Sequence, residues 1–197
     1  MAQKTRVIGI TGGIGSGKSF ISNEIERRGY AVYNSDLNAR NIIDTDPHVI
    51  QQLKQLFGND IYSSNGLNRP AVAERVFANK QLLQQMNAIV HPAVKQHFIT
   101  WAASQKQPVF LEAAILVESG FYVFCDEVVL VTAPLDIRIN RVLKRDNTTR
   151  EAIIQRIRNQ MPDETLRQYA TVVVNNDETK SISDLVDELF RKLEMLK

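Results

Sequence analysis

The sequence alternates short apolar runs with longer segments in which apolar residues recur every three or four positions. Five runs are rich in valine and isoleucine and are bounded by polar or turn residues: RVIGIT (6–11), YAVYNS (30–35), PVFLEA (108–113), EVVLVT (127–132) and ATVVVN (170–175). Strands buried on both faces of a parallel sheet read as continuous apolar runs, and amphipathic helices have the longer spacing. The pattern predicts a doubly wound α/β fold with a five-stranded parallel sheet.

The interval between the second and third predicted strands is too long for one crossover helix. It covers residues 37–107 and has helical spacing in HVIQQLKQLFG, PAVAERVFANKQLLQQMNAIV and PAVKQHFITWAASQ. A crossover needs only about a dozen residues or somewhat more. We therefore expect residues 1–197 to form a single domain, with a nucleotide-binding core at 1–36 and 108–197. Residues 37–107 would be a helical substrate-binding insert, in which FGNDIYSSNGLNRP is a loop or short hairpin.

An arginine-rich segment follows the fourth predicted strand. Residues 138–158 hold seven basic and two acidic residues, and Arg138, Arg141 and Arg145 would share one face of a helix. Arginine stabilises the charge on a phosphoryl group in transfer. We expect a helical lid at about residues 138–160; the alternative is a solvated basic helix face. The last segment, SISDLVDELFRKLEML, predicts an amphipathic helix with a serine cap.

The composition limits the kinds of molecule that this protein is expected to bind and the compartment in which it is expected to act. The formal net charge is +2, from 24 basic and 22 acidic residues, which argues against a general nucleic-acid surface. Cys125 is the only cysteine, so an internal disulfide is excluded and a reducing compartment is favoured. Glycines occur too close to the N-terminus for a signal peptide, and no apolar run approaches the roughly 20 residues of a membrane span. We expect a cytoplasmic protein with no membrane or nucleic-acid partner.

The segment from residue 12 to residue 19 has the form G-x-x-x-x-G-K-S, between a predicted strand and a helical pattern. Glycines allow a backbone to wrap a polyphosphate with its N–H groups pointing inward. The predicted phosphate contacts come from Gly12, Gly13, Ile14, Gly15, Ser16 and Gly17. Lys18 would neutralise the β- and γ-phosphates and Ser19 would bind Mg²⁺. The alternative, a glycine-rich turn without a ligand, is disfavoured by the strand-to-helix context. The motif therefore predicts binding of a nucleoside triphosphate.

Asp36 follows the second predicted strand and should emerge at the same sheet edge as the loop. A carboxylate there suits a base that accepts the proton of an attacking hydroxyl. The alternative is that Ser35 or Asp36 caps a helix beginning at Leu37, and the two roles are compatible.

Two further acids follow the third predicted strand. Glu112 is expected to contact magnesium or the substrate, as an acid at the end of a buried strand does in related sites; a structural acid is the alternative. Glu118 and His91 are each more simply interpreted as structural residues. No histidine or cysteine pair has metal-ligand spacing.

Six motifs in order resemble the dephospho-coenzyme A kinase family over nearly the whole chain: GITGGIGSGKS, SDLNAR, LNRPAVAERVF, IVHPAV, EAAILVESG and RVLKRD. The resemblance implies a P-loop kinase core, a helical substrate-binding domain and a lid. It implies ATP-dependent phosphorylation of the ribose 3′-hydroxyl of dephospho-coenzyme A, with Mg²⁺. The implied roles are the catalytic aspartate for Asp36, lid arginines for Arg141 and Arg145, substrate contacts for Arg40, Arg69 and His91, and the adenine region for Asn176.

Three positions depart from the family pattern. Asn34 stands where the family often has the first aspartate of Asp-x-Asp, so only Asp36 remains as the base. Glu112 and Ala114 replace an aspartate and a proline, and Thr171 replaces another aspartate. These changes concern details of the magnesium and substrate contacts.

Two other functions compete with this interpretation. Another P-loop kinase, acting on a nucleoside monophosphate or a small alcohol, would share the loop and lid without needing so long an insert. A nucleotide switch or motor ATPase would carry Asp-x-x-Gly or Asn-Lys-x-Asp motifs, which this sequence lacks.

Overall fold

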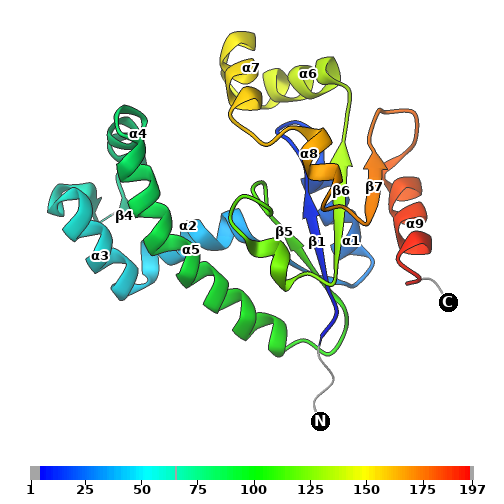
Figure 1. Ribbon diagram of the computed structural model, residues 1–197, viewed down its shortest axis with the longest axis horizontal. Helices are drawn as coiled ribbons and strands as arrows, with labels where there is room; N and C mark the ends of the chain where they lie inside the picture. The colour runs from blue at the N-terminus through cyan, green and yellow to red at the C-terminus, as the bar shows by residue number, and fades with distance from the viewer. Residues whose placement is uncertain (1–4, 65, 196–197) are drawn as a thin grey trace. The chain divides into compact units, whose positions relative to one another are not determined.

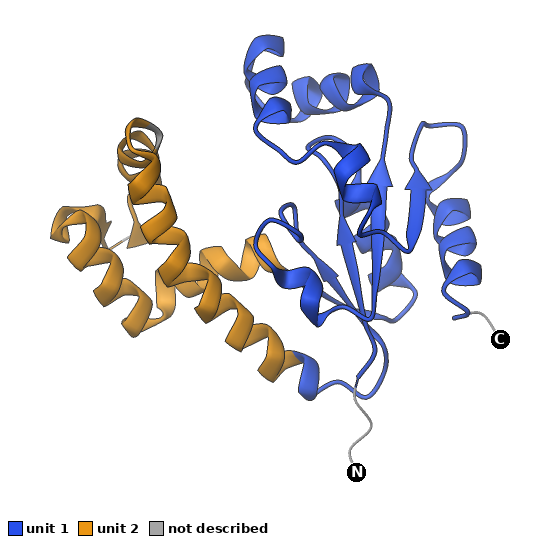
Figure 2. Cartoon of the chain, in the orientation of Figure 1, with its two compact units in different colours: residues 1–34, 102–197 blue, residues 35–101 orange. Residues whose placement is uncertain are grey.

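The computed structural model describes residues 5–64 and 66–195 (Figure 1). Its contacts divide the chain into two compact units, unit 1 with residues 1–34 and 102–197 and unit 2 with residues 35–101 (Figure 2). Unit 1 contains a five-stranded parallel sheet in the order β2-β5-β1-β6-β7. Its strands are β1 (Val7–Thr11), β2 (Ala31–Asn34), β5 (Val109–Glu112), β6 (Glu127–Thr132) and β7 (Val172–Asn175). The predicted α/β class and parallel sheet are confirmed.

One face of this sheet is covered by α1 (Lys18–Arg27) and α9 (Ile182–Lys192). Alternate residues of a strand point to opposite faces, and Val129 and Val131 of β6 pack on this side. The predicted C-terminal helix is confirmed as α9, whose cap residue Ser181 accepts a hydrogen bond at Oγ from the Asp184 N–H at 3.1 Å. Leu189 and its apolar neighbours on α9 then complete the core.

The opposite face is covered by shorter elements. Leu130, the β6 residue between two that face α9, packs with Val117 and with Leu166 of α8 (Asp163–Arg167). A 3₁₀ helix, η2 (Phe121–Phe124), ends the segment that follows β5. Both faces of the central strands are therefore buried, as their uninterrupted apolar sequences require.

Two helices precede α8 between β6 and β7. They are α6 (Leu135–Arg145) and α7 (Arg150–Arg158). Their shared apolar contacts, here called the α6–α7 core, consist of Ile139, Val142 and Ile153, with Ile14, Ile154 and Ile157 packed against them. Ile14 belongs to the glycine-rich loop, so this small core joins the helices to that loop.

Unit 2 is helical with one short hairpin. Its elements are α2 (Ser35–Thr45), α3 (Pro47–Phe57), η1 (Asn59–Ile61), β3 (Tyr62–Ser63), β4 (Gly66–Leu67), α4 (Arg69–Ala78) and most of α5 (Lys80–Ala103). Strands β3 and β4 pair antiparallel, as the hairpin alternative for this segment predicted. None of the described helices is long and apolar enough to cross a membrane.

The helix boundaries in unit 2 differ from those suggested by the sequence. The helical pattern over residues 70–90 is split at Asn79, whose Oδ1 accepts hydrogen bonds from the N–H groups of Gln81 and Leu82 and so caps α5. Helix α5 then continues through Pro92. Proline removes only one backbone donor, and a helix of 24 residues retains enough other hydrogen bonds to accommodate it.

Candidate active site

The glycine-rich loop joins the end of β1 to the start of α1. Strand β1 ends at Thr11 and α1 begins at Lys18, which gives the strand–loop–helix arrangement that the motif requires. Gly17 is the N-cap of α1 with φ of 94°, a conformation that favours glycine. A Cβ atom at residue 17 would also lie 2.1 Å from Nδ2 of Asn176. Only glycine therefore allows the loop to approach this side chain so closely.

Lys18 lies at the positive end of α1 and folds back onto the loop. Its ammonium Nζ donates hydrogen bonds to the carbonyl oxygens of Gly12 at 2.6 Å and Gly13 at 3.4 Å. The helix N-terminus adds its own positive partial charge in the same place. The loop is consequently an electropositive site suited to an anion.

Arg141 and Asn176 hold the carbonyl side of the loop. Asn176 is almost fully buried and its Nδ2 donates to the carbonyl of Ser16 at 3.0 Å. The Arg141 guanidinium donates to the backbone oxygen and Oδ1 of Asn176, both at 3.1 Å, and lies 3.3–3.4 Å from the carbonyls of Gly15 and Ser16. The structure thus brings Arg141, a predicted lid arginine from α6, together with Asn176, predicted to lie near the adenine, from the segment after β7.

Ser19 contacts an acid from a neighbouring strand. Its Oγ donates to Oε1 of Glu112 at 3.0 Å, and Nδ2 of Asn34 donates to the other carboxylate oxygen at 3.3 Å. Glu112 is buried at the carboxyl end of β5, where it is in register with Asn34 of β2. A hydroxyl and a carboxylate are hard oxygen ligands of the type that Mg²⁺ prefers. These residues fit a magnesium site that the triphosphate would complete.

Arg145, the second predicted lid arginine, forms an ion pair with Asp146. Its guanidinium donates to Asp146 at 2.8 and 3.2 Å, and Nη1 of Arg156 lies 3.6 Å from the same carboxylate. The hydrogen bond between Arg145 and Asp146 raises the pKa of the arginine and lowers the pKa of the aspartate. The structure therefore does not place Arg145 with Arg141; it places Arg145 in an exposed ion-pair group at the end of α6.

Asp36, the predicted base, is the second residue of α2 and is exposed. The helix begins at Ser35, two residues before the predicted start at Leu37, so both candidate cap residues lie in its first turn. A carboxylate in the first turn interacts favourably with the helix dipole. Asp36 follows Asn34, the last residue of β2, by two positions.

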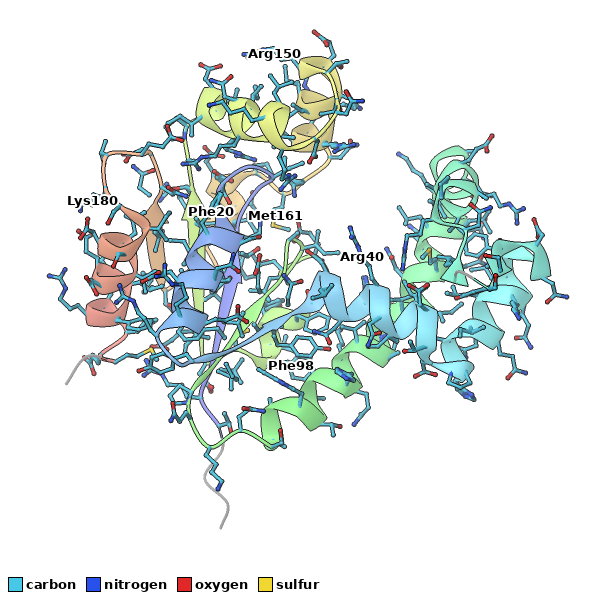
Figure 3. All side chains as sticks on the ribbon, turned by 180° about the vertical axis from the view of Figure 1, so that it is seen from behind. Phe20, Arg40, Phe98, Arg150, Met161 and Lys180 are labelled. Carbon is cyan, nitrogen blue, oxygen red and sulfur yellow. The ribbon has the colours of Figure 1, made fainter. Side chains whose placement is uncertain are left out.

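Unit 2 brings two predicted substrate residues close together. Nη2 of Arg69 lies 2.5 Å from Oδ2 of Asp44 and 3.4 Å from the carbonyl oxygen of Arg40. The Arg40 side chain itself is exposed on α2 (Figure 3). His91 lies on α5, where burial, and secondarily the charge of Lys95, lower its pKa. His91 is therefore neutral near pH 7.

Gln160 is a loop contact that the sequence analysis missed. Its Oε1 accepts a hydrogen bond from the N–H of Ile14 at 2.7 Å. The two residues are 146 positions apart, and a single glutamine belongs to no motif that marks a phosphate-binding site. Only the fold could have revealed this contact.

The fold and the site together define a P-loop kinase. A glycine-rich loop follows the central strand of a parallel sheet, Lys18 and Ser19 begin the next helix, and an acid lies on the adjacent strand. The sequence model described as dephospho-CoA kinase matches residues 6–181. The chain belongs to the dephospho-CoA kinase family, as its motifs predicted. It is a kinase of coenzyme A biosynthesis, a phosphotransferase with an alcohol group as acceptor.

Curated relatives agree with this assignment. The chain is 41% identical over 195 residues to the dephospho-CoA kinase of Bacteroides fragilis strain YCH46, covering 96% of this chain and 95% of the relative. It is 41% identical over 160 residues to the dephospho-CoA kinase of Porphyromonas gingivalis, covering 81% and 79% of the two chains.

Solved structures share the fold. A protein from Thermus thermophilus has a TM-score of 0.85 at 35% identity and covers 99% of this chain and 100% of that one. Dephospho-CoA kinase from Campylobacter jejuni has a TM-score of 0.71 at 18% identity, with 95% and 96% covered. Shikimate kinase from Acinetobacter baumannii has a TM-score of 0.59 at 15% identity, with 98% and 96% covered. The last two comparisons bear on the fold alone.

Proposed function

We propose that this protein transfers the γ-phosphoryl group of ATP to the ribose 3′-hydroxyl of dephospho-CoA, giving CoA and ADP. The observation that carries the proposal is the contact between Ser19 and Glu112 beside Lys18, in a chain of this family. A triphosphate loop, a metal-binding pair and a lysine are the parts that phosphoryl transfer requires.

The loop holds the triphosphate through its backbone N–H groups, and Lys18 leaves the Gly12 carbonyl to bind the phosphate oxygens. Ser19 and Glu112 would hold Mg²⁺, which when bound draws charge from the β- and γ-phosphate oxygens. Asn176 and Arg141 keep the loop in place on its carbonyl side. Arg145 is proposed as a second lid residue that binds the triphosphate, a role for which its guanidinium would have to leave Asp146.

Asp36 orients the acceptor hydroxyl and takes its proton as the new O–P bond forms and the bond to ADP breaks. The transition state of such transfers is loose, so the position of the hydroxyl contributes more than the removal of its proton. Water is a competing acceptor, and α6 and α7 act as the lid that excludes it.

Unit 2 supplies the acceptor contacts in this proposal. Dephospho-CoA carries a diphosphate, and arginine is well suited to bidentate contacts with phosphate oxygens. Arg40 is exposed, and Arg69 is fixed beside it by Asp44. Neutral His91 offers one donor and one acceptor for the remaining polar groups.

The acceptor is tested by measuring ADP release with ATP and Mg²⁺ in the presence of dephospho-CoA, adenosine, AMP or no acceptor. We expect strong stimulation by dephospho-CoA alone, with CoA as product. Greater stimulation by AMP would indicate a nucleoside monophosphate kinase, and slow turnover unaffected by any acceptor would indicate a nucleotide switch. Either result would contradict the proposed acceptor while leaving the fold unchanged.

Glu112→Gln is expected to raise the Mg²⁺ concentration for half-maximal activity about 10- to 100-fold, because an acid that binds or orients a metal typically contributes that much to its affinity. The amide can still accept the Ser19 hydrogen bond, so the loop should keep its shape. The measurement is a Mg²⁺ titration at saturating ATP. Glu118→Gln, which changes an exposed acid six residues further along the same segment, should leave the titration unchanged. Identical curves for the two variants would remove Glu112 from the metal site.

A further inference from the structure

Ile14, in the glycine-rich loop, is contacted by α6, by α7 and by the segment that joins α7 to α8. Its N–H donates to Oε1 of Gln160 at 2.7 Å. Its carbonyl accepts a hydrogen bond from Nε of Arg138 at 2.9 Å. Its side chain packs against the α6–α7 core. Both polar groups of one loop residue, and its side chain, are therefore fixed by a separate part of unit 1.

Arg138 is unusual among the arginines of α6 because only 7% of it is exposed. Its Nη1 lies 3.5 Å from Oδ2 of Asp163, the first residue of α8, which supplies the opposite charge that a buried guanidinium needs. A Cβ atom at residue 13 would lie 2.0 Å from Nη2 of Arg138. The guanidinium thus lies directly against the loop backbone at Gly13, and it is not the solvated charge that the helical spacing alone allowed.

A glycine-rich loop has many backbone conformations, and only a few of them point its N–H groups at a phosphate. Fixing a binding segment in its bound conformation beforehand reduces the entropy lost when the ligand binds. Arg138 and Gln160 each use a hydrogen bond at Ile14 to restrict this segment, and Asp163 restricts Arg138 in turn.

We propose that Arg138, Gln160 and Asp163 form a clamp on the backbone of Ile14 that sets the affinity of the loop for ATP. They are positioning residues, because Arg138 and Gln160 contact the loop and Asp163 contacts Arg138. The clamp also connects α6 to the loop, and α8 through Asp163, so lid helix α6 is mechanically linked to the nucleotide site. This inference rests on the proposed use of ATP, and it adds residues for which the family motifs provided no role.

The test compares Arg138→Lys and Gln160→Met with the surface variant Arg191→Gln. Lysine keeps the charge opposite Asp163 but lacks the Nε–H that reaches Ile14, and methionine has no amide oxygen to accept the Ile14 N–H. Arg191 is exposed on α9, outside the loop and the lid, and its Nε donates to the carbonyl oxygen of Asp187 at 3.3 Å. Calorimetry with Mg²⁺ and a non-hydrolysable ATP analogue gives the dissociation constant, steady-state assays give kcat at saturating ATP, and thermal melts without nucleotide report folding.

We expect the dissociation constant to rise about tenfold in each clamp variant, equivalent to about 1.4 kcal/mol, and kcat at saturating ATP to stay within about twofold of wild type. The double variant should bind less than a hundredfold more weakly than wild type, because both changes release the backbone of the same residue, Ile14, and their effects should not add. Arg191→Gln should bind like wild type.

Unchanged dissociation constants in both clamp variants would overturn the clamp, and so would lower melting temperatures without a change in affinity, which would show a packing role only. If Arg138→Lys fails to fold, Gln160→Met decides alone, because its side chain is partly exposed. Failure of the wild-type protein itself to bind the analogue would overturn the proposed function together with the clamp; normal binding by the wild type and both variants would overturn the clamp alone.

Discussion

Replacing Lys18 with alanine is expected to lower kcat by about 100- to 1,000-fold, the usual effect of removing one preorganised donor from a developing negative charge. It should also raise the dissociation constant for ATP about tenfold or more, because the ammonium binds the phosphates before the reaction as well as during it. In the structure Nζ is already held at the loop by the Gly12 and Gly13 carbonyls, so little reorganisation separates this position from the phosphates.

Steady-state kinetics and calorimetry with an ATP analogue would measure the two effects separately. Lys106→Ala is the matched control, because Lys106 is an exposed lysine before the amino end of β5, and ligands of parallel sheets bind at the carboxyl ends. It should leave both quantities unchanged. If Lys18→Ala lost only affinity and kept kcat at saturating ATP, the lysine would bind the ground state and transition state equally, and its catalytic role would be refuted.

Local sequence patterns were sufficient to predict the sheet and the loop. Each strand of the sheet is a short apolar run whose burial on both faces leaves a distinct signature, and the G-x-x-x-x-G-K-S motif is contiguous. The role of Glu112 was harder to predict, since a glutamate at the end of a strand can be a metal ligand, a substrate contact or a structural acid. Its contact with Ser19 depends on β5 lying beside β1, a pairing that no single segment encodes.

Contacts that depend on distant segments could not be predicted in the same way. Gln160 reaches Ile14 only because α7 leads back toward the loop, and a helical pattern does not distinguish the buried Arg138 from the exposed Arg145 on the same face. Helix α5 crosses Pro92 because the rest of a long helix compensates for one missing donor. In each case tertiary packing decided between alternatives that the local sequence left open.

The Asp36→Asn variant is expected to lose about 100- to 10,000-fold in kcat, the range for removing a general base, while KM for ATP changes little. Asparagine is nearly isosteric and keeps the side chain in the first turn of α2, but it lacks the charged oxygen that orients the acceptor hydroxyl and accepts its proton. The expected loss therefore falls mainly on the chemical step, in contrast to Lys18→Ala, which should change both binding and rate.

The control for Asp36→Asn must account for the helix dipole. Asp184 is also an exposed acid in the first turn of a helix, α9, and Asp184→Asn should cost a similar small amount of stability while leaving kcat at the wild-type value. Steady-state rates at saturating dephospho-CoA and ATP would compare the two variants. Near-normal turnover by Asp36→Asn would refute the base assignment. A large rise in KM for dephospho-CoA with kcat preserved would instead make Asp36 a residue that binds the acceptor. Losing a contact that binds substrate and transition state equally raises KM and leaves kcat unchanged.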